Sequence, residues 1–172
     1  MPIAEGDLEF RISGGANNES PAAALGGAMS TKAAGVITTE ELNNIFDDIS
    51  GDEGKAGDIE YRGIYVKNKH GSLTLQGAKI WITQDADSAD DATAIALADE
   101  AVNESMETIA NESTAPSGPA FSAPTTKEAG LSIGNIPAGQ AKGIWIRRTI
   151  TAGAAAKNKV TFKLRVEGDT AE

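Results

Sequence analysis

The chain has 172 residues, a formal net charge of -10, a single His and no Cys. Without Cys there are no disulfides, thiolate zinc sites, iron–sulfur clusters or thiol nucleophiles, and one His excludes a multi-histidine metal site. Only 33 residues are Leu, Ile, Val or Phe, whereas 29 are Ala. A folded core therefore requires the large apolar side chains to be concentrated in particular segments.

The first ten residues carry acids where signal and transit peptides carry bases, and every apolar run is shorter than the ~20 residues needed to cross a bilayer. We therefore expect a soluble protein that begins near Met1 and has no membrane partner. The acidic pI of about 4.6 argues against nucleic acid as a partner, because phosphate binding depends on clustered Lys and Arg.

Alternation of apolar and polar side chains predicts a series of short strands. Within 73–83 the apolar phase changes across Gln76 and Gly77, which predicts a bulge. The segment from Lys69 to Ser72 has the composition of a hairpin turn between two of the strands. Strands are predicted at 8–13, 59–68, 73–83, 93–98, 143–151 and 160–166, with a tight turn at 134–140.

One short helix is predicted after Thr38. Thr38 and Glu41 have the spacing of a capping box, and an apolar face follows before Gly51, formed by Leu42, Ile45, Phe46 and Ile49. Around Met106 the sequence is compatible either with a turn of helix or with a loop.

Short strands separated by Gly, Pro and Asp clusters are typical of an antiparallel β-sandwich, and we expect one such mainly β domain over residues 1–172. Residues 13–35 contain only Leu25 and Met29 as large apolar side chains. This Gly/Ala-rich segment is predicted to be an extended arm or loop that orders against a surface, and 111–119 is a flexible connection of similar composition.

Charge is unevenly distributed along the chain. Residues 40–60 carry a net charge of -7 and residues 85–112 carry -9, whereas residues 129–166 contain seven bases and no acid. These charges are either simply solvated, or acidic loops of one copy meet a basic sheet face of a neighbour. On the second interpretation the candidate partner-binding residues are the following: Lys142, Arg147, Arg148, Lys163 and Arg165 on the basic face, and Leu25 and Met29 on the arm.

Few residues suggest chemistry. The four aspartates Asp85, Asp87, Asp90 and Asp91 could supply oxygen ligands to a structural calcium ion, but they lack the EF-hand spacing, and a solvated loop is the simpler interpretation. His70 lies in a predicted turn without a nucleophile motif, so we interpret it as a polar surface residue. Trp81 and Trp145 lie in predicted strands as core or interface anchors. We expect no enzyme activity and no cofactor.

Six stretches of the chain resemble a family of tailed-bacteriophage virion proteins with an immunoglobulin-like β-sandwich, although the likeness is one of overall pattern and includes no catalytic signature. The stretches are DLEFRISGGANNESPAAALGGAMS, FDDISGDEGKAGDIEYRGIYVKN, GSLTLQGAKIWI, ANESTAPSGPAFSAP, AGLSIGNIPAGQAKGIWIRRTITAGAAA and VTFKLRVEGDT.

Small immunoglobulin-like members of that family often lie on capsid exteriors as decoration or cement proteins. The resemblance therefore implies an immunoglobulin-like fold and a capsid decoration, or cement, protein on the virion exterior. Its partners would be the major capsid protein and copies of itself, as a homotrimer or another homo-oligomer. The alternatives are a tail, baseplate or head–tail connector component, and an immunoglobulin-like module that binds a host surface or carbohydrate, which would expose aromatic side chains.

Overall fold

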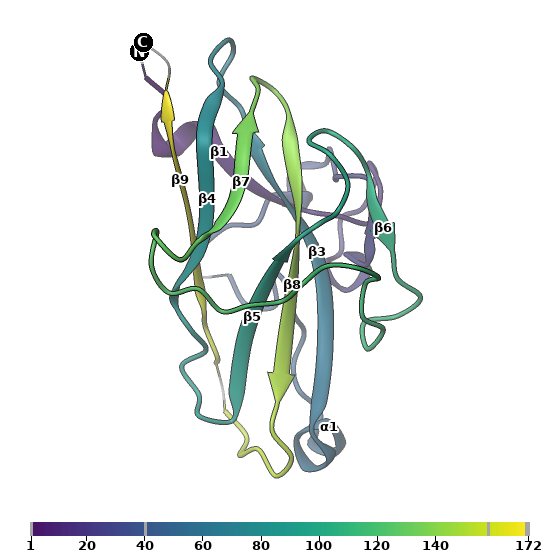
Figure 1. The fold of residues 1–172 in the computed structure, drawn as a ribbon. Coiled ribbons are helices and arrows are strands. Elements are labelled where there is room, and N and C mark those ends of the chain that lie inside the picture. Colours follow the sequence, from purple (N-terminus) through teal and green to yellow (C-terminus); the bar gives the residue numbers. More distant parts are fainter. Residues whose placement is uncertain (1, 40, 158, 171–172) are drawn as a thin grey trace.

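The computed structural model describes residues 2–39, 41–157 and 159–170, which form a mainly β fold of antiparallel sheets packed face to face (Figure 1). One short α-helix and three single turns of 3-10 helix, at Glu5–Asp7, Pro21–Ala23 and Ala33–Gly35, lie in the connections. The elements are β1 (Leu8–Ile12), β2 (Gly26–Gly27), α1 (Gly51–Ala56), β3 (Asp58–Asn68), β4 (Leu75–Gln84), β5 (Asp91–Leu97), β6 (Met106–Thr108), β7 (Leu131–Ile136), β8 (Ala141–Ile150) and β9 (Lys163–Thr170).

Two sheets form the sandwich. Sheet A has the strand order β1-β3-β8-β5, and sheet C has the order β7-β4-β9. The longest pairing joins β3 to β8, from Asp58 opposite Ile150 to Lys67 opposite Ala141. The short strands β2 and β6 form a separate two-stranded ribbon.

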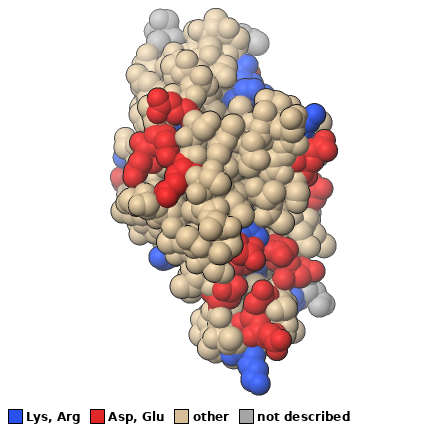
Figure 2. All heavy atoms as spheres, turned by 90° about the vertical axis from the view of Figure 1, so that its right-hand side faces the viewer, with Lys and Arg blue, Asp and Glu red and all other residues tan. Residues whose placement is uncertain are grey.

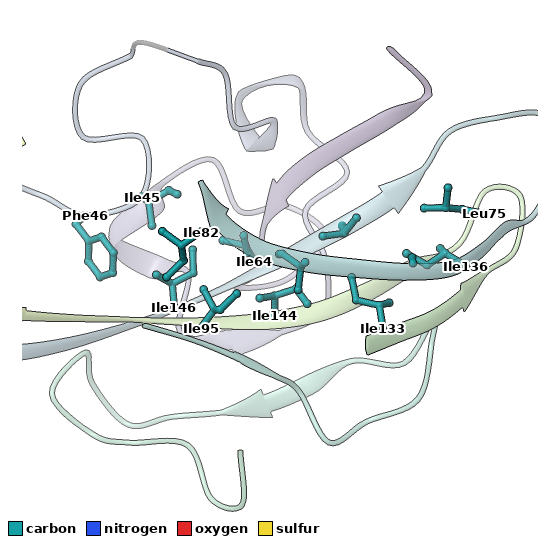
Figure 3. Close-up of a cluster of buried hydrophobic side chains, with 13 residues drawn as sticks. Ile45, Phe46, Ile64, Leu75, Ile82, Ile95, Ile133, Ile136, Ile144 and Ile146 are labelled. Carbon is teal, nitrogen blue, oxygen red and sulfur yellow. The ribbon is translucent and has the colours of Figure 1, made fainter. Parts of the chain in front are cut away.

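The core lies between the two sheets, and isoleucine dominates it (Figure 3). Because side chains alternate along a strand, every second residue of β3, β4, β5 and β8 points into this space. The segment before α1 and strand β7 each add two residues to this core. The buried core residues are Ile45, Phe46, Ile64, Val66, Leu75, Ala78, Ile80, Ile82, Ile95, Ile133, Ile136, Ile144 and Ile146. The thin supply of large apolar residues is thus concentrated on the inner faces of the sheets.

The strand order differs from that of an immunoglobulin constant domain. If the seven sandwich strands are lettered A to G along the chain, one sheet here is A-B-F-D and the other is E-C-G. An immunoglobulin constant domain instead has A-B-E-D and C-F-G. The antiparallel sandwich expected from the sequence is therefore present, with a different exchange of strands between its sheets.

Most of the predicted strands are confirmed to within two residues. The last one begins later than predicted, at Lys163, because the backbone at Thr161 bonds to the loop at Asp87: Thr161 N donates to Asp87 Oδ1 at 2.7 Å. The predicted bulge is present as a register shift between Leu75 and Ala78. Strand β7 was not predicted. Its last residues, 134–136, fall within the tight turn predicted at 134–140.

The predicted hairpin turn at Lys69–Ser72 is wrong. It connects β3 to β4, but these strands belong to opposite sheets, so the chain crosses from one layer to the other there.

The helix predicted after Thr38 is also wrong. Glu40 lies outside the described residues, and within 41–50 only 42–46 form turns and bends, whereas the rest is irregular. Leu42 is 64% exposed although Ile45 and Phe46 are buried, so the residues of the predicted apolar face are not buried together. The helix instead begins after Ser50, whose side chain and that of Glu53 form a reciprocal capping box.

Core packing at β8 is tested by Ile144→Ala. Ile144 is fully buried, so the substitution leaves a cavity and is expected to lower the free energy of unfolding by about 3 kcal/mol in chemical denaturation. Ile59→Ala on β3 is the matched control, because Ile59 is 43% exposed; its cost is expected to be below about 1 kcal/mol. Equal losses would contradict the assignment of Ile144 to the core.

Candidate functional site

Loops cover the outward face of sheet A and form a third layer, which we call the outer layer and define as residues 13–30 and 98–122 (Figure 1). Beneath it the outward side chains of β3 and β8 are buried: Tyr65 is 2% exposed and Trp145 is fully buried. The second apolar cluster consists of Tyr61, Tyr65, Ala96, Ala98, Met106, Ile109, Ala141 and Trp145, with Leu25, Met29 and Phe121 packed against it.

Tyr65 fixes both halves of the outer layer to the sheet. Its hydroxyl donates to the carbonyl oxygen of Gly27 at 2.6 Å and accepts from the amide of Met106 at 2.9 Å. The side chain of Met106 then lies over Gly63 and Gly143, where a Cβ atom would come within 3.1 Å and 2.5 Å of it. The two strands therefore need Gly at these positions for the outer layer to approach.

Backbone hydrogen bonds continue this attachment along the edges of sheet A. β1 pairs with β3 only from Ile64 onwards. On the rest of that edge, the amides of Gly63 and Tyr61 donate to the carbonyl oxygens of Ala24 and Glu112, both at 2.7 Å. On the opposite edge, Ile95 of β5 forms a bridge with Ser122. The outer layer thus substitutes for a neighbouring strand at both edges.

The Gly/Ala-rich segment 13–35 lies on this chain's own sheet. Ser13 and Ser30 are fully buried, and Asn18 links them. Its side-chain Nδ2 donates to the backbone carbonyl oxygen of Ser13, and its own backbone carbonyl oxygen accepts from Ser30 Oγ, each at 2.6 Å. Leu25 and Met29, predicted as partner contacts, are half-buried against the apolar cluster. The surface that this segment needs is supplied from within the chain.

A shallow hollow of about 350 Å³ opens in the outer layer, next to the β2–β6 ribbon. Its walls are mostly backbone and small side chains: Gly14, Gly15, Ala23, Leu25, Gly26, Gly27, Ala28, Thr108 and Ile109. No charged residue lines it. It could accommodate an apolar side chain of a partner, with little polar surface to desolvate.

The predicted basic sheet face is wrong as a single surface, because β8 belongs to sheet A and β9 to sheet C. Lys142 is buried and has the same parity along β8 as the core residues Ile144 and Ile146. Its ammonium group donates to the carbonyl oxygens of Ala98, at 2.7 Å, and of Glu100, and its burial lowers its pKa. The guanidinium carbon of Arg147 lies 5.3 Å from the ring centroid of Phe121. Lys163 and Arg165 are exposed on β9.

Arg148 belongs to a cluster of charged groups at the α1 end of the sandwich. Its guanidinium pairs with Asp91 at 2.7 Å and approaches Glu60 at 3.5 Å. Arg62, which is fully buried, pairs with Asp47 at 3.1 Å and with Glu112. We call these two arginines and four acids the end cluster.

Phe46, a residue of the buried core, lies between the end cluster and the rest of that core. The guanidinium carbons of Arg62 and Arg148 lie 5.5 Å and 5.7 Å from its ring centroid, and the ring of Phe162 is 6.4 Å away on another side. Glu60 and Arg62 have the same parity along β3 as the core residues Ile64 and Val66. Alternation in the sequence therefore indicated that both charged side chains face inward, but this was not used to predict the cluster.

Four carboxyl groups share two guanidinium groups in the end cluster, and Glu60 is the most deeply buried of the four acids. Burial raises the pKa of Glu60 from 4.5 to about 7, against the attraction of Arg148 and Arg62, with Glu112 and Asp47 adding to the rise. The Glu60 side chain therefore changes its protonation near neutral pH.

Metal binding fits these acids poorly. Carboxylate oxygens of Asp47, Glu60 and Glu112 lie within 4.8 Å of one another, but the guanidinium of Arg62 already bonds to two of the three groups and supplies positive charge there. The aspartates predicted as a calcium site do not converge within the described residues: Asp85 accepts from Thr93 N, Asp87 from Thr161 N, Asp90 from Ala155 N, and Asp91 pairs with Arg148.

The lone His has a structural position. Nδ1 of His70 accepts from the amides of Ser72 and Leu73 at 3.2 Å and 3.0 Å, and so shapes the crossing from β3 to β4. Trp81 and Trp145, predicted to be core or interface anchors, are both buried.

No family model, curated protein or solved structure shows a significant match to this chain. In the described part of the chain, no helix is long and apolar enough to cross a membrane.

Gly26→Ala tests the close approach of β2 to β6 within the two-stranded ribbon. Gly26 has φ of +90°, and its Cβ would lie 1.7 Å from the carbonyl oxygen of Glu107, so the backbone must shift. We expect a loss of about 3–5 kcal/mol of unfolding free energy in chemical denaturation. Gly15→Ala is the control, since Gly15 has φ of +102° with open space around it; its conformational cost alone is about 1–2 kcal/mol. Similar losses for both variants would refute close approach at Gly26.

Glu60→Gln tests the protonation of the end cluster. Because the folded-state pKa of Glu60 is raised to about 7 from 4.5, its protonated form stabilises the fold. That contribution is fully present below about pH 4.5 and is lost as pH rises through 7, by at most about 3 kcal/mol. Urea denaturation from pH 5 to pH 8 should show falling stability for the wild type and a flatter profile for Glu60→Gln.

Glu5→Gln, at an exposed carboxyl group, is the control and should keep the wild-type pH profile. A Glu60→Gln profile as steep as that of the wild type would assign the pH dependence to another group.

Proposed function

We propose that this chain is a non-enzymatic structural protein of a tailed-phage virion, and that it acts as a capsid decoration protein on the outer surface of the major capsid protein lattice. The sequence resemblance suggests the class. The structural observation that supports it best is the outer layer, a preformed loop surface fastened to a rigid sandwich.

The outer layer has the properties of a docking surface. Tyr65, Asn18 and the bonds at the edges of sheet A already order its loops, so binding would cost little additional loop entropy. Figure 2 shows the face of the molecule on this side, where a broad area without charged side chains is flanked by groups of acidic residues. A charge-poor centre with a charged rim is the usual arrangement of a protein interface.

Acidic residues of the outer layer are partly used to shape it. Glu100 accepts from the amide of Glu107 at 2.7 Å, and Glu107 accepts from the amide of Ser117 at 2.8 Å. The remaining negative charge would favour a basic surface on the capsid lattice and would select the orientation of docking more than its strength.

The carbohydrate-binding alternative requires exposed aromatic side chains. The two Trp and two Tyr of the chain are at most 8% exposed. None of the four is available to stack on a sugar ring, so this alternative has less support than a protein-binding surface.

Ala23→Glu in the wall of the hollow tests the docking surface. Ala23 is exposed, so the fold should tolerate a carboxylate there, whereas a capsid surface docked on the hollow should not. Binding of purified protein to heads that lack it, measured by co-sedimentation, is expected to weaken by about tenfold or more. Ala129→Glu, exposed beyond the outer layer, should bind like the wild type.

The location of the protein is tested on the virion itself. Cryo-electron microscopy of the parent particle, with copy number from quantitative mass spectrometry, should find this chain at lattice positions over the head. Density on the tail or connector alone, with a low copy number, would refute the capsid assignment.

A further inference from the structure

Strand β9 leaves one edge of the sandwich open. It is the outermost strand of sheet C, and the pairing of its backbone within the described residues is with β4 only. The contacts from Ile3 and Lys127 are to its side chains: the amide of Ile3 donates to Thr170 Oγ1 at 3.1 Å, and the ammonium group of Lys127 pairs with Glu167 at 3.1 Å. An unpaired edge of this kind is a template for another strand.

β9 carries little that would prevent such pairing. The register shifts of the β4–β9 pair come from extra residues in β4, at Gln76/Lys79 and Ile82/Gln84, so β9 itself stays regular. It contains no Pro. Its inner residues Leu164 and Val166 are only partly buried at the border of the core, where a further strand would extend their cover.

The charges of β9 are arranged symmetrically. Lys163, Arg165, Glu167 and Asp169 share its outer face, with two bases followed by two acids around the central Val166. In an antiparallel pair of two such strands, each base of one strand can therefore lie opposite an acid of the other.

Only one register achieves this. Registers shifted by an odd number of residues place outer side chains opposite inner ones. A two-fold axis at Arg165 or at Glu167 places two like charges directly opposite each other, which destabilises the pair. An axis at Val166 places Arg165 opposite the second copy's Glu167, and Lys163 opposite its Asp169.

We propose that two copies of this chain associate through β9, which pairs antiparallel with the same strand of the second copy about a two-fold axis at Val166. The two sheets C then join into one continuous sheet of six strands, β7-β4-β9 followed by its symmetry mate. Arg165 is 62% exposed and currently pairs with Glu167 of its own strand at 2.6 Å, so it can exchange that contact for the equivalent group across the axis.

The charge pattern provides the first test, by analytical ultracentrifugation of the full chain over a concentration series. The wild type should approach twice the monomer mass of 17.7 kDa. Arg165→Glu places Glu opposite Glu twice and should return the protein to monomer at the same concentrations. The double variant Arg165→Glu/Glu167→Arg reverses the pattern and should restore the dimer.

Lys55→Glu on α1 is the matched control: it makes the same change in net charge away from β9 and should leave the dimer intact. Circular dichroism establishes that each variant is folded. A wild type that remains monomeric throughout the series, or a double variant that fails to recover, overturns the proposal.

The second test traps the register. The natural chain has no Cys, and Val166→Cys would place the two thiols opposite each other at the axis, within reach of a disulfide under mild oxidation. Leu164→Cys, on the same inner face, would place them roughly 13 Å apart and should not cross-link. Equal cross-linking of both variants would refute this register. Both tests use the isolated protein, so their outcome is separate from that of head binding.

Discussion

Strands β3 and β8 bury side chains on both of their faces, and this requirement determines how the rest of the chain is arranged. Ile64 and Ile144 point into the sandwich, whereas Tyr65 and Trp145 point away from it and are buried as well. An antiparallel sheet commonly has one face in water. Sheet A needs cover on both, and a seven-stranded sandwich supplies only one of them.

The second cover is built from residues with little apolar surface of their own. Gly, Ala and Ser in 13–30 allow the backbone to approach the sheet closely, and Met106 fills the space that Gly63 and Gly143 leave open. The low content of large apolar residues and the high content of Ala and Gly are therefore two aspects of one arrangement. A dense isoleucine core lies between the sheets, and a hydrogen-bonded layer of small residues lies outside sheet A.

Local alternation was sufficient to predict six of the seven sandwich strands, because a period of two is visible within a few residues of sequence. The same local reasoning wrongly predicted a helix after Thr38. The conformation there depends on contacts with residues far along the chain, since Phe46 packs against Arg62 and Arg148 and Asp47 pairs with Arg62. The basic stretch from Lys142 to Arg165 was misinterpreted for a related reason. Its strands are neighbours in sequence but lie in different sheets, and only the tertiary fold shows that Arg148 is enclosed while Arg165 is exposed.

The pairings of β3 with β8 and of β4 with β9 also determine the order in which the protein can fold. Both join segments from the first half of the chain to segments near its end, with three other strands of the sandwich between the partners in sequence. During synthesis, β3 and β4 leave the ribosome long before their partners, so neither sheet can close until translation is nearly complete. Closure of such long loops is slow, and the apolar strands stay exposed to aggregation in the interval. Rapid production of many copies in one cell would therefore depend on the capacity of that cell to hold unfinished chains apart.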